Sequence, residues 1–137
     1  MAVPSPVESS EASTARRTAA DEAGFYLGPL LRPLLLLLVG EDPAHGYGLV
    51  ERLGRLGVPP RRANTLYREL HDLEANGLIE SSWDASQTRG PPRRIYRLTA
   101  AGKCELDAIM PAVASVGHAL MEAVARDDAR KARRPGN

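Results

Sequence analysis

The chain has 137 residues, enough for one domain of ordinary size with short flanking segments. Its formal net charge of +1 does not by itself indicate a polyanion partner, so such a partner has to be argued from where the charges lie. The single cysteine excludes an internal disulfide and a multi-cysteine zinc site, and it favours a reducing cytoplasm.

Neither end of the chain is expected to join the core. Residues 1–26 are rich in Ala, Ser, Thr, Pro and Glu without apolar periodicity, which predicts a disordered N-terminal extension. Residues 127–137 are predicted to form a frayed or solvated basic tail. The apolar run LLLLLV (34–39) is much shorter than the roughly 20 residues of a membrane helix, so no membrane partner is expected.

Leucines at helical spacing predict three helices between residues 31 and 76. Pro33 is tolerable only in a first turn, so the first helix is expected to start near Leu31. Glycines mark the helix ends, and EDPAHG is expected to be a loop. The three predicted helices run from Leu31 to Gly40, from Gly46 to Leu56 and from Arg61 to Asn76.

A hairpin and a final helix follow. Residues Leu78 to Trp83 and Arg94 to Leu98 are typical of short strands, and Thr99 stands where a helix N-cap is expected. The order helix, helix, helix, hairpin, helix predicts a mainly α fold with a small β wing. Residues 27–98 are thus interpreted as a winged helix-turn-helix domain, and residues 99–126 as a C-terminal dimerisation helix.

The third helix has an apolar and a polar face. On an ideal helical wheel Leu66, Leu70 and Leu73 fall within about 60° of one another. The opposite face carries guanidinium, amide and hydroxyl groups, with no carboxylate in its first two turns. Arginine can pair with guanine and asparagine with adenine, so this face suits the major groove of DNA. A merely solvated polar face remains the alternative.

Two further features strengthen a DNA interpretation. Tyr67 lies at the border of the wheel, where its ring can pack on the second helix while its hydroxyl reaches a phosphate. Arginines flank the stiff Gly-Pro-Pro tip of the hairpin, a position suited to phosphate or minor-groove contact; the alternative is an edge hairpin kept soluble by charge. The candidate DNA-contact residues are Arg61, Arg62, Asn64, Thr65, Tyr67, Arg68, Arg89, Arg93 and Arg94.

Three segments together resemble the PadR family of winged-helix transcriptional regulators. They are LLLLLVGEDPAHGYGLVERL (34–53), NTLYRELHDLEANGLI (64–79) and GPPRRIYRLTAAGK (90–103). The resemblance implies a homodimeric repressor that binds a partly palindromic operator. It also implies DNA contacts by Asn64, Thr65, Tyr67, Arg68, Arg93 and Arg94.

One departure limits what this resemblance carries over. Before T-L-Y the family commonly has a small or capping residue and then glycine, where this chain has Ala63 and Asn64. The base preference of the family is therefore not transferred.

The last helix carries an apolar seam at steps of three and four residues. A small domain has little core left to cover such a seam, which predicts a second subunit as its partner; the alternative is that the seam folds back onto the first helix. Pro111 is expected to kink this helix or to start a new one. The predicted dimerisation residues are Leu106, Ile109, Met110, Val113, Val116, Leu120 and Val124.

The leading hypothesis is a DNA-binding repressor, and the alternative is a winged-helix adaptor that grips an acidic protein. An enzyme is disfavoured, because His45, His71 and His118 are scattered and no catalytic motif occurs; no catalytic residue, metal site or cofactor is predicted. A small-molecule effector site between the apolar seam and the first helix stays open, with Trp83 either lining it or covering the core.

Overall fold

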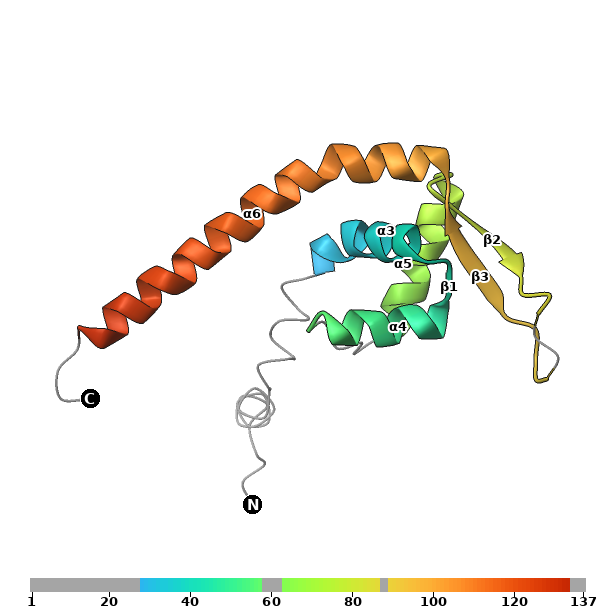
Figure 1. Ribbon diagram of the computed structural model, residues 1–137, viewed down its shortest axis with the longest axis horizontal. Helices are drawn as coiled ribbons and strands as arrows, with labels where there is room; N and C mark the ends of the chain where they lie inside the picture. Colours follow the sequence, from blue (N-terminus) through green and yellow to red (C-terminus); the bar gives the residue numbers. More distant parts are fainter. Residues whose placement is uncertain (1–27, 58–62, 87–88, 134–137) are drawn as a thin grey trace, which may run out of the picture.

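The computed structural model describes residues 28–57, 63–86 and 89–133, without the side chains of residues 63 and 64 (Figure 1). The predicted N-terminal extension lies outside this part. The described elements, in chain order, are η1 (Gly28–Leu30), α3 (Leu31–Glu41), β1 (Ala44–His45), α4 (Gly46–Arg55), α5 (Ala63–Ala75), β2 (Ile79–Trp83), β3 (Arg94–Leu98) and α6 (Ala100–Ala132).

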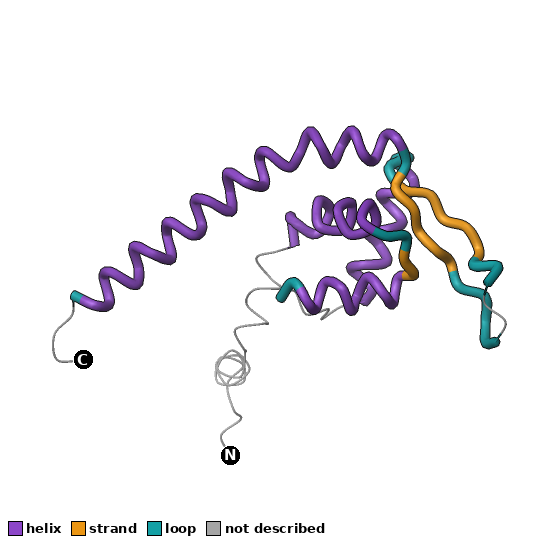
Figure 2. The backbone as a smooth tube through the Cα atoms, viewed as in Figure 1, coloured by secondary structure: helices purple, strands orange, loops and turns teal. Residues whose placement is uncertain are grey.

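Three helices and one side of a small sheet enclose an aliphatic core (Figure 2). The leucine stripe of α5 is buried as predicted, with Leu66, Leu70 and Leu73 between 0% and 3% exposed. These leucines meet Leu35 and Leu49, which α3 and α4 contribute at full burial. The polar side of α5 therefore faces away from the core.

The sheet has three strands in the order β1-β3-β2, both pairings antiparallel. The expectation that EDPAHG is entirely a loop is wrong, because Ala44 and His45 pair with Tyr96 and Ile95 of β3. Two residues are too few to show an alternating pattern, so this strand leaves no signal in the sequence. Strand β3 begins and ends at the predicted residues, and β2 starts one residue later than predicted.

Helix α3 ends one residue beyond the predicted stop at Gly40. Its last carbonyls are bonded by a side chain from α4, since the Arg52 guanidinium donates to the Leu38 oxygen at 2.6 Å and to the Asp42 oxygen at 3.0 Å. Free carbonyl groups at a helix end need such partners. Arg52 thus holds the first two helices of the domain together.

Helix α6 begins at the predicted N-cap, where the Thr99 hydroxyl accepts from the Gly102 amide at 3.0 Å and donates to the Gly77 oxygen at 2.7 Å. It is continuous through Pro111, so no new helix starts there, and it arches along its length (Figure 1). Proline removes one hydrogen bond from the preceding turn, which allows such an arch without ending the helix.

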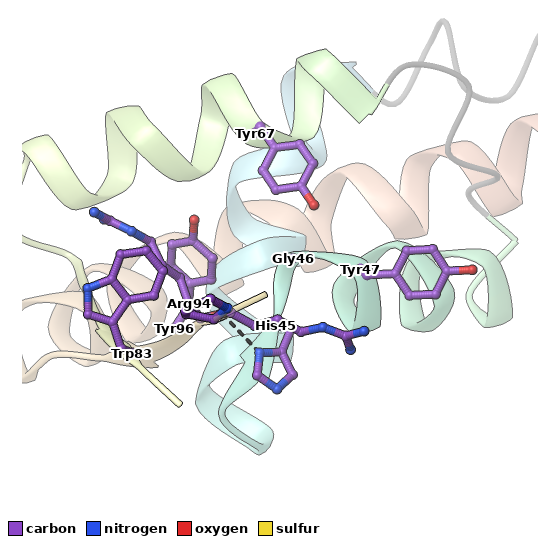
Figure 3. Close-up of a pocket in the computed structure, with 9 residues that line it drawn as sticks. His45, Gly46, Tyr47, Tyr67, Trp83, Arg94 and Tyr96 are labelled. Carbon is purple, nitrogen blue, oxygen red and sulfur yellow. Dashed lines mark hydrogen bonds between the residues drawn. The ribbon is translucent and has the colours of Figure 1, made fainter. Parts of the chain in front are cut away.

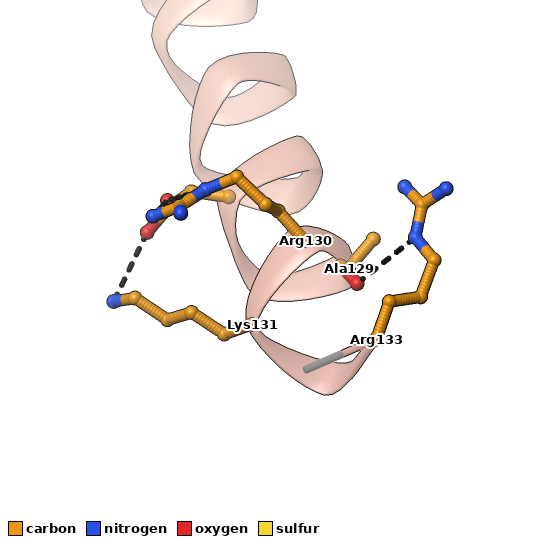
Figure 4. A network of polar contacts seen from close by, with 5 residues as sticks. Ala129, Arg130, Lys131 and Arg133 are labelled. Carbon is orange, nitrogen blue, oxygen red and sulfur yellow. Dashed lines mark hydrogen bonds and ion pairs between the residues drawn. The ribbon is translucent and has the colours of Figure 1, made fainter. Parts of the chain in front are cut away.

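The tail was predicted to be frayed or solvated; it is helical as far as Ala132, where α6 ends, and most of its described residues are exposed. Ion pairs one turn apart support this end: Asp127 lies 2.8 Å from Arg130 and 3.0 Å from Lys131 (Figure 4). Hydrogen bonds from Arg130, and then from Lys131, lower the pKa of the Asp127 carboxyl. The prediction for this tail rested on its composition alone, and composition does not show which residues form ion pairs.

The apolar seam of α6 divides into two parts. Leu106, which was predicted to face a second subunit, is half-buried and packs against the chain's own core where α6 lies beside α3. Farther along, Val116, Leu120 and Val124 are between 45% and 56% exposed, as is Met121 at 69%. The fold-back alternative thus holds for the start of the helix, and an uncovered apolar face remains on the rest.

By length and composition alone, α6 also qualifies as a helix that could cross a membrane.

Candidate nucleic-acid interface

Helix α5 presents a polar ridge to solvent. Thr65 and Arg68 are exposed on the side opposite the buried leucines, as is His71 one turn later. Arg61 and Arg62 and the side chain of Asn64 lie outside the described part of the chain, so their predicted contacts are not placed. The described half of the ridge offers hydroxyl and guanidinium groups above a rigid leucine support.

Tyr67 stands beside this ridge and packs on the first residue of α4, as its border position predicted. A β-carbon built on Gly46 would lie 2.6 Å from Tyr67 Cε1 and 2.9 Å from its hydroxyl oxygen. Only glycine leaves room for the ring there. This contact holds the ring, and Tyr67 as a whole remains 47% exposed, with its hydroxyl pointing toward the start of α4 (Figure 3).

The wing arginines lie at two places on the hairpin. Arg89 and Arg93 are exposed near the hairpin tip. Arg94 instead lies along the sheet, where its guanidinium stacks over the Trp83 ring at 5.1 Å and donates to the Ser81 hydroxyl at 3.0 Å. This arginine is engaged within the domain, although sequence reasoning grouped it with the others.

A hydrogen-bonded relay joins the wing to α5. The Ser81 hydroxyl, which accepts from Arg94, donates to the Glu74 carboxylate at 2.6 Å. These three residues come from β2, β3 and α5, so the relay sets the wing at one position against the polar ridge. Their separation in sequence left no motif by which to find them.

An open cavity of about 480 Å³ lies between the start of α4, α5 and the wing (Figure 3). Its walls are aromatic and basic, and no carboxylate of the described residues lines it. Trp83 is 61% exposed on this wall, so it does not cover the core. Burial raises the pKa of Tyr96, which forms the cavity floor, and Glu74 adds to this effect. The lining residues are His45, Gly46, Tyr47, Tyr67, Trp83, Pro92, Arg93, Arg94 and Tyr96.

His45 joins three elements at the edge of this cavity. Its side chain does not cap α4. Nδ1 lies 3.0 Å from the Arg94 carbonyl oxygen, and Nε2 lies 3.1 Å from Asp84 Oδ2. The Asp84 carboxylate also accepts from the amide and the hydroxyl of Ser86 at 3.0 and 2.6 Å, and these bonds are the main reason that its pKa is lowered.

Comparisons with known proteins agree with this architecture. Residues 34–108 match the Transcriptional regulator PadR-like family. Transcriptional regulator Rv3488 of Mycobacterium tuberculosis (strain ATCC 25618 / H37Rv) is 41% identical over 68 residues, which cover 48% of this chain and 59% of that protein. The match thus spans less than two thirds of this relative.

Two solved structures are similar. A PadR family transcriptional regulator from Eggerthella lenta DSM 2243 is 35% identical, with a TM-score of 0.50 over 77% of this chain and 91% of that chain. Bacillus subtilis PadR in complex with operator DNA is 25% identical, with a TM-score of 0.54 over 59% of this chain and 46% of that chain.

Proposed function

The chain belongs to the PadR-like family of transcriptional regulators, a family of regulators and not of enzymes, and on this premise we propose that it is a homodimeric, cytoplasmic repressor that binds a partly palindromic DNA operator. The observation that carries the proposal is the exposed polar ridge of α5 beside a basic wing. Bacillus subtilis PadR, which shares this fold, has been solved with operator DNA.

The chemistry of the ridge suits the major groove. Arg68 projects from an element whose opposite face is locked in the core, so its guanidinium can approach a guanine edge without reordering the helix. Thr65 lies one turn earlier and can donate to a phosphate. Asn64 remains a predicted adenine contact, and Arg61 and Arg62 remain predicted phosphate contacts.

The wing and the tyrosine supply affinity more than sequence choice. Arg89 and Arg93 near the hairpin tip, together with the Tyr67 hydroxyl, are suited to phosphate oxygens on either side of the groove. Each phosphate neutralised by arginine releases condensed counterions, which makes binding depend steeply on salt. Arg94 acts indirectly, because its hydrogen bond to Ser81 and its stacking on Trp83 hold the wing in place.

The uncovered part of the apolar seam supports a dimer. A face carrying Val116, Leu120 and Val124 at the surface of a small domain is normally buried against another apolar face. A second copy related by a two-fold axis presents the same residues and closes the assembly. Two ridges then face DNA about 34 Å apart, one turn of the duplex, which explains a palindromic operator.

A duplex-binding titration tests the proposal. Fluorescence anisotropy with the DNA upstream of the protein's own gene should show tight binding that weakens as salt is raised, and a scrambled duplex of equal length should bind more weakly. Equal affinity for both duplexes would remove sequence recognition and favour the winged-helix adaptor. Recovery of the protein with membranes rather than with the cytoplasm would instead show that the apolar face of α6 meets lipid.

A further inference from the structure

The imidazole of His45 lies between two hydrogen-bond acceptors. On one side is the Arg94 carbonyl oxygen, 3.0 Å from Nδ1 (Figure 3). On the other side is the Asp84 carboxylate, 3.1 Å from Nε2. A carbonyl oxygen cannot donate, and neither can an ionised carboxylate. Both bonds therefore need a hydrogen on the ring.

A neutral imidazole carries one N–H, whereas the imidazolium carries two. Only the cation can donate to both acceptors at once. After the ring loses one proton, one of its nitrogens faces an acceptor without a hydrogen to donate. We propose that His45 is a positioning residue for DNA binding, which holds the wing against the start of α4 only while both of its nitrogens are protonated. This inference rests on the proposed function of the wing.

The link lies at the base of the wing. Asp84 directly follows β2, and its amide donates to the Arg93 carbonyl at 2.8 Å. Arg94 opens β3, so the two acceptors of His45 come from the two arms of the hairpin. The ring also belongs to β1, next to the α4 residue on which Tyr67 packs. Protonation of His45 thus couples the position of Arg93 on the wing to the position of the polar ridge on α5.

The direction of the pH effect follows from this chemistry. The doubly protonated ring, and with it the full link, is present at lower pH and is lost as pH rises, and imidazole groups change charge mainly between pH 5 and 8. Tyrosine and arginine side chains ordinarily change charge well above this range, and carboxylates below it. The ionisable groups around the ring and its cavity are Asp84, Tyr47, Tyr67, Glu74, Arg93, Arg94 and Tyr96.

One isosteric variant separates this mechanism from a general effect of pH. In Asp84→Asn, the amide oxygen can keep the two bonds from Ser86 while the amide nitrogen replaces Oδ2 opposite His45. That nitrogen donates to a neutral Nε2 but opposes a protonated one. The variant should therefore hold the wing at pH 8 and loosen it at pH 6, the reverse of the wild-type chain.

The wing can be observed without DNA, because Trp83 is the single tryptophan of the chain and stacks with Arg94. Tryptophan emission of the full chain should shift between pH 6 and pH 8, and Asp84→Asn should reverse or abolish the shift. His71→Gln and His118→Gln, which remove the other histidines, should keep it. A shift that survives in Asp84→Asn but disappears in His71→Gln would overturn the proposal.

DNA binding gives a second measurement. Affinity for the upstream duplex should fall by about 1.5-fold to fivefold from pH 6 to pH 8 at constant salt in the wild-type chain, and should not fall in Asp84→Asn. Glu80→Gln removes an equal charge from exposed β2 without touching His45, so it should keep the wild-type slope. Parallel slopes for all three proteins would refute the inference. Absence of binding at every pH would refute the proposed function instead, while tryptophan emission would still test the link.

Discussion

The ring of Tyr67 lies against Gly46, so closely that a β-carbon on the glycine would come within 2.6 Å of Cε1. This contact joins Gly46, the first residue of α4, to Tyr67 of the T-L-Y segment (65–67) in α5. It explains why α4 begins with a glycine and why Tyr67 is held at the border of the polar ridge. The position of Tyr67 is thus set by the absence of a side chain opposite it.

Gly46→Ala tests this contact. Alanine ordinarily favours a helix over glycine, but here the tyrosine ring must move, and overpacking costs about 1–3 kcal/mol. We expect a lower free energy of unfolding in urea together with weaker DNA binding. Gly48→Ala, two residues away with nothing within 4 Å of the added carbon, should be neutral or stabilising. Identical behaviour of the two variants would contradict the packing role.

Arg52→Met tests the link between α3 and α4. Methionine keeps the apolar stem and removes both donors, leaving the carbonyls of Leu38 and Asp42 without this partner. We expect a loss of about 1–3 kcal/mol in the free energy of unfolding. Arg55→Met, an exposed arginine later in the same helix, should change stability far less. Comparable losses in both would show that the carbonyl bonds contribute little.

Leu120→Glu tests the dimer. Two glutamates brought into one apolar contact would be desolvated, so we expect sedimentation to show a single subunit, with operator affinity falling as dimerisation is lost. The fold of each subunit should be retained, because Leu120 is 56% exposed. His118→Glu places the same charge on the opposite side of α6 and should leave the dimer intact. A dimer that survives Leu120→Glu would move the interface elsewhere.

Arg68→Ala tests base recognition. A good arginine–guanine pair contributes about 1–3 kcal/mol of discrimination, so operator affinity should fall more than affinity for random DNA. Arg93→Ala, at the wing, should lower the affinity for both duplexes alike and reduce the salt dependence of binding. Anisotropy titrations on both duplexes measure the two ratios. Equal losses on operator and random DNA in Arg68→Ala would remove its role in sequence choice.

Ser86→Ala tests the turn at the base of the wing. Hydrogen bonds from Ser86 are the main cause of the lowered pKa of Asp84, so removing the hydroxyl should raise this pKa toward the ordinary 3.8. Because the folded-state pKa lies below the unfolded one, the carboxylate stabilises the turn above that range and ceases to do so as pH falls. Carboxyl chemical shifts followed by NMR should show the Ser86→Ala turn opening at higher pH. The pKa of Asp127 should not move.

Much of the fold followed from local patterns. The buried stripe of α5, both ends of β3 and the Thr99 cap each depend on residues within one or two turns of one another, so spacing and residue type suffice to predict them. The family motifs are of the same kind, and they supported a DNA interpretation that the helix face and the wing arginines already indicated. Position on a helical wheel also placed Tyr67 correctly at a boundary.

The features that the sequence did not predict depend on contacts between distant segments. His45 bonds to Arg94, 49 residues later, and Arg52 bonds to Leu38, 14 residues earlier. The two-residue strand β1 exists only because β3 lies beside it. Arg94 resembled its neighbours until the sheet placed it over Trp83. The division of the α6 seam likewise depends on how far α3 reaches along it, which no single helix reveals.

The 33 residues of α6 span roughly 50 Å at the usual helical rise. Its first turns pack beside α3, and its uncovered apolar residues lie from its middle onward. In a dimer joined there, the helix acts as a lever. A rotation of about 10° at the junction would displace each DNA-reading head by several ångströms. A small molecule bound at the junction of the two helices can therefore weaken DNA binding without contacting the duplex.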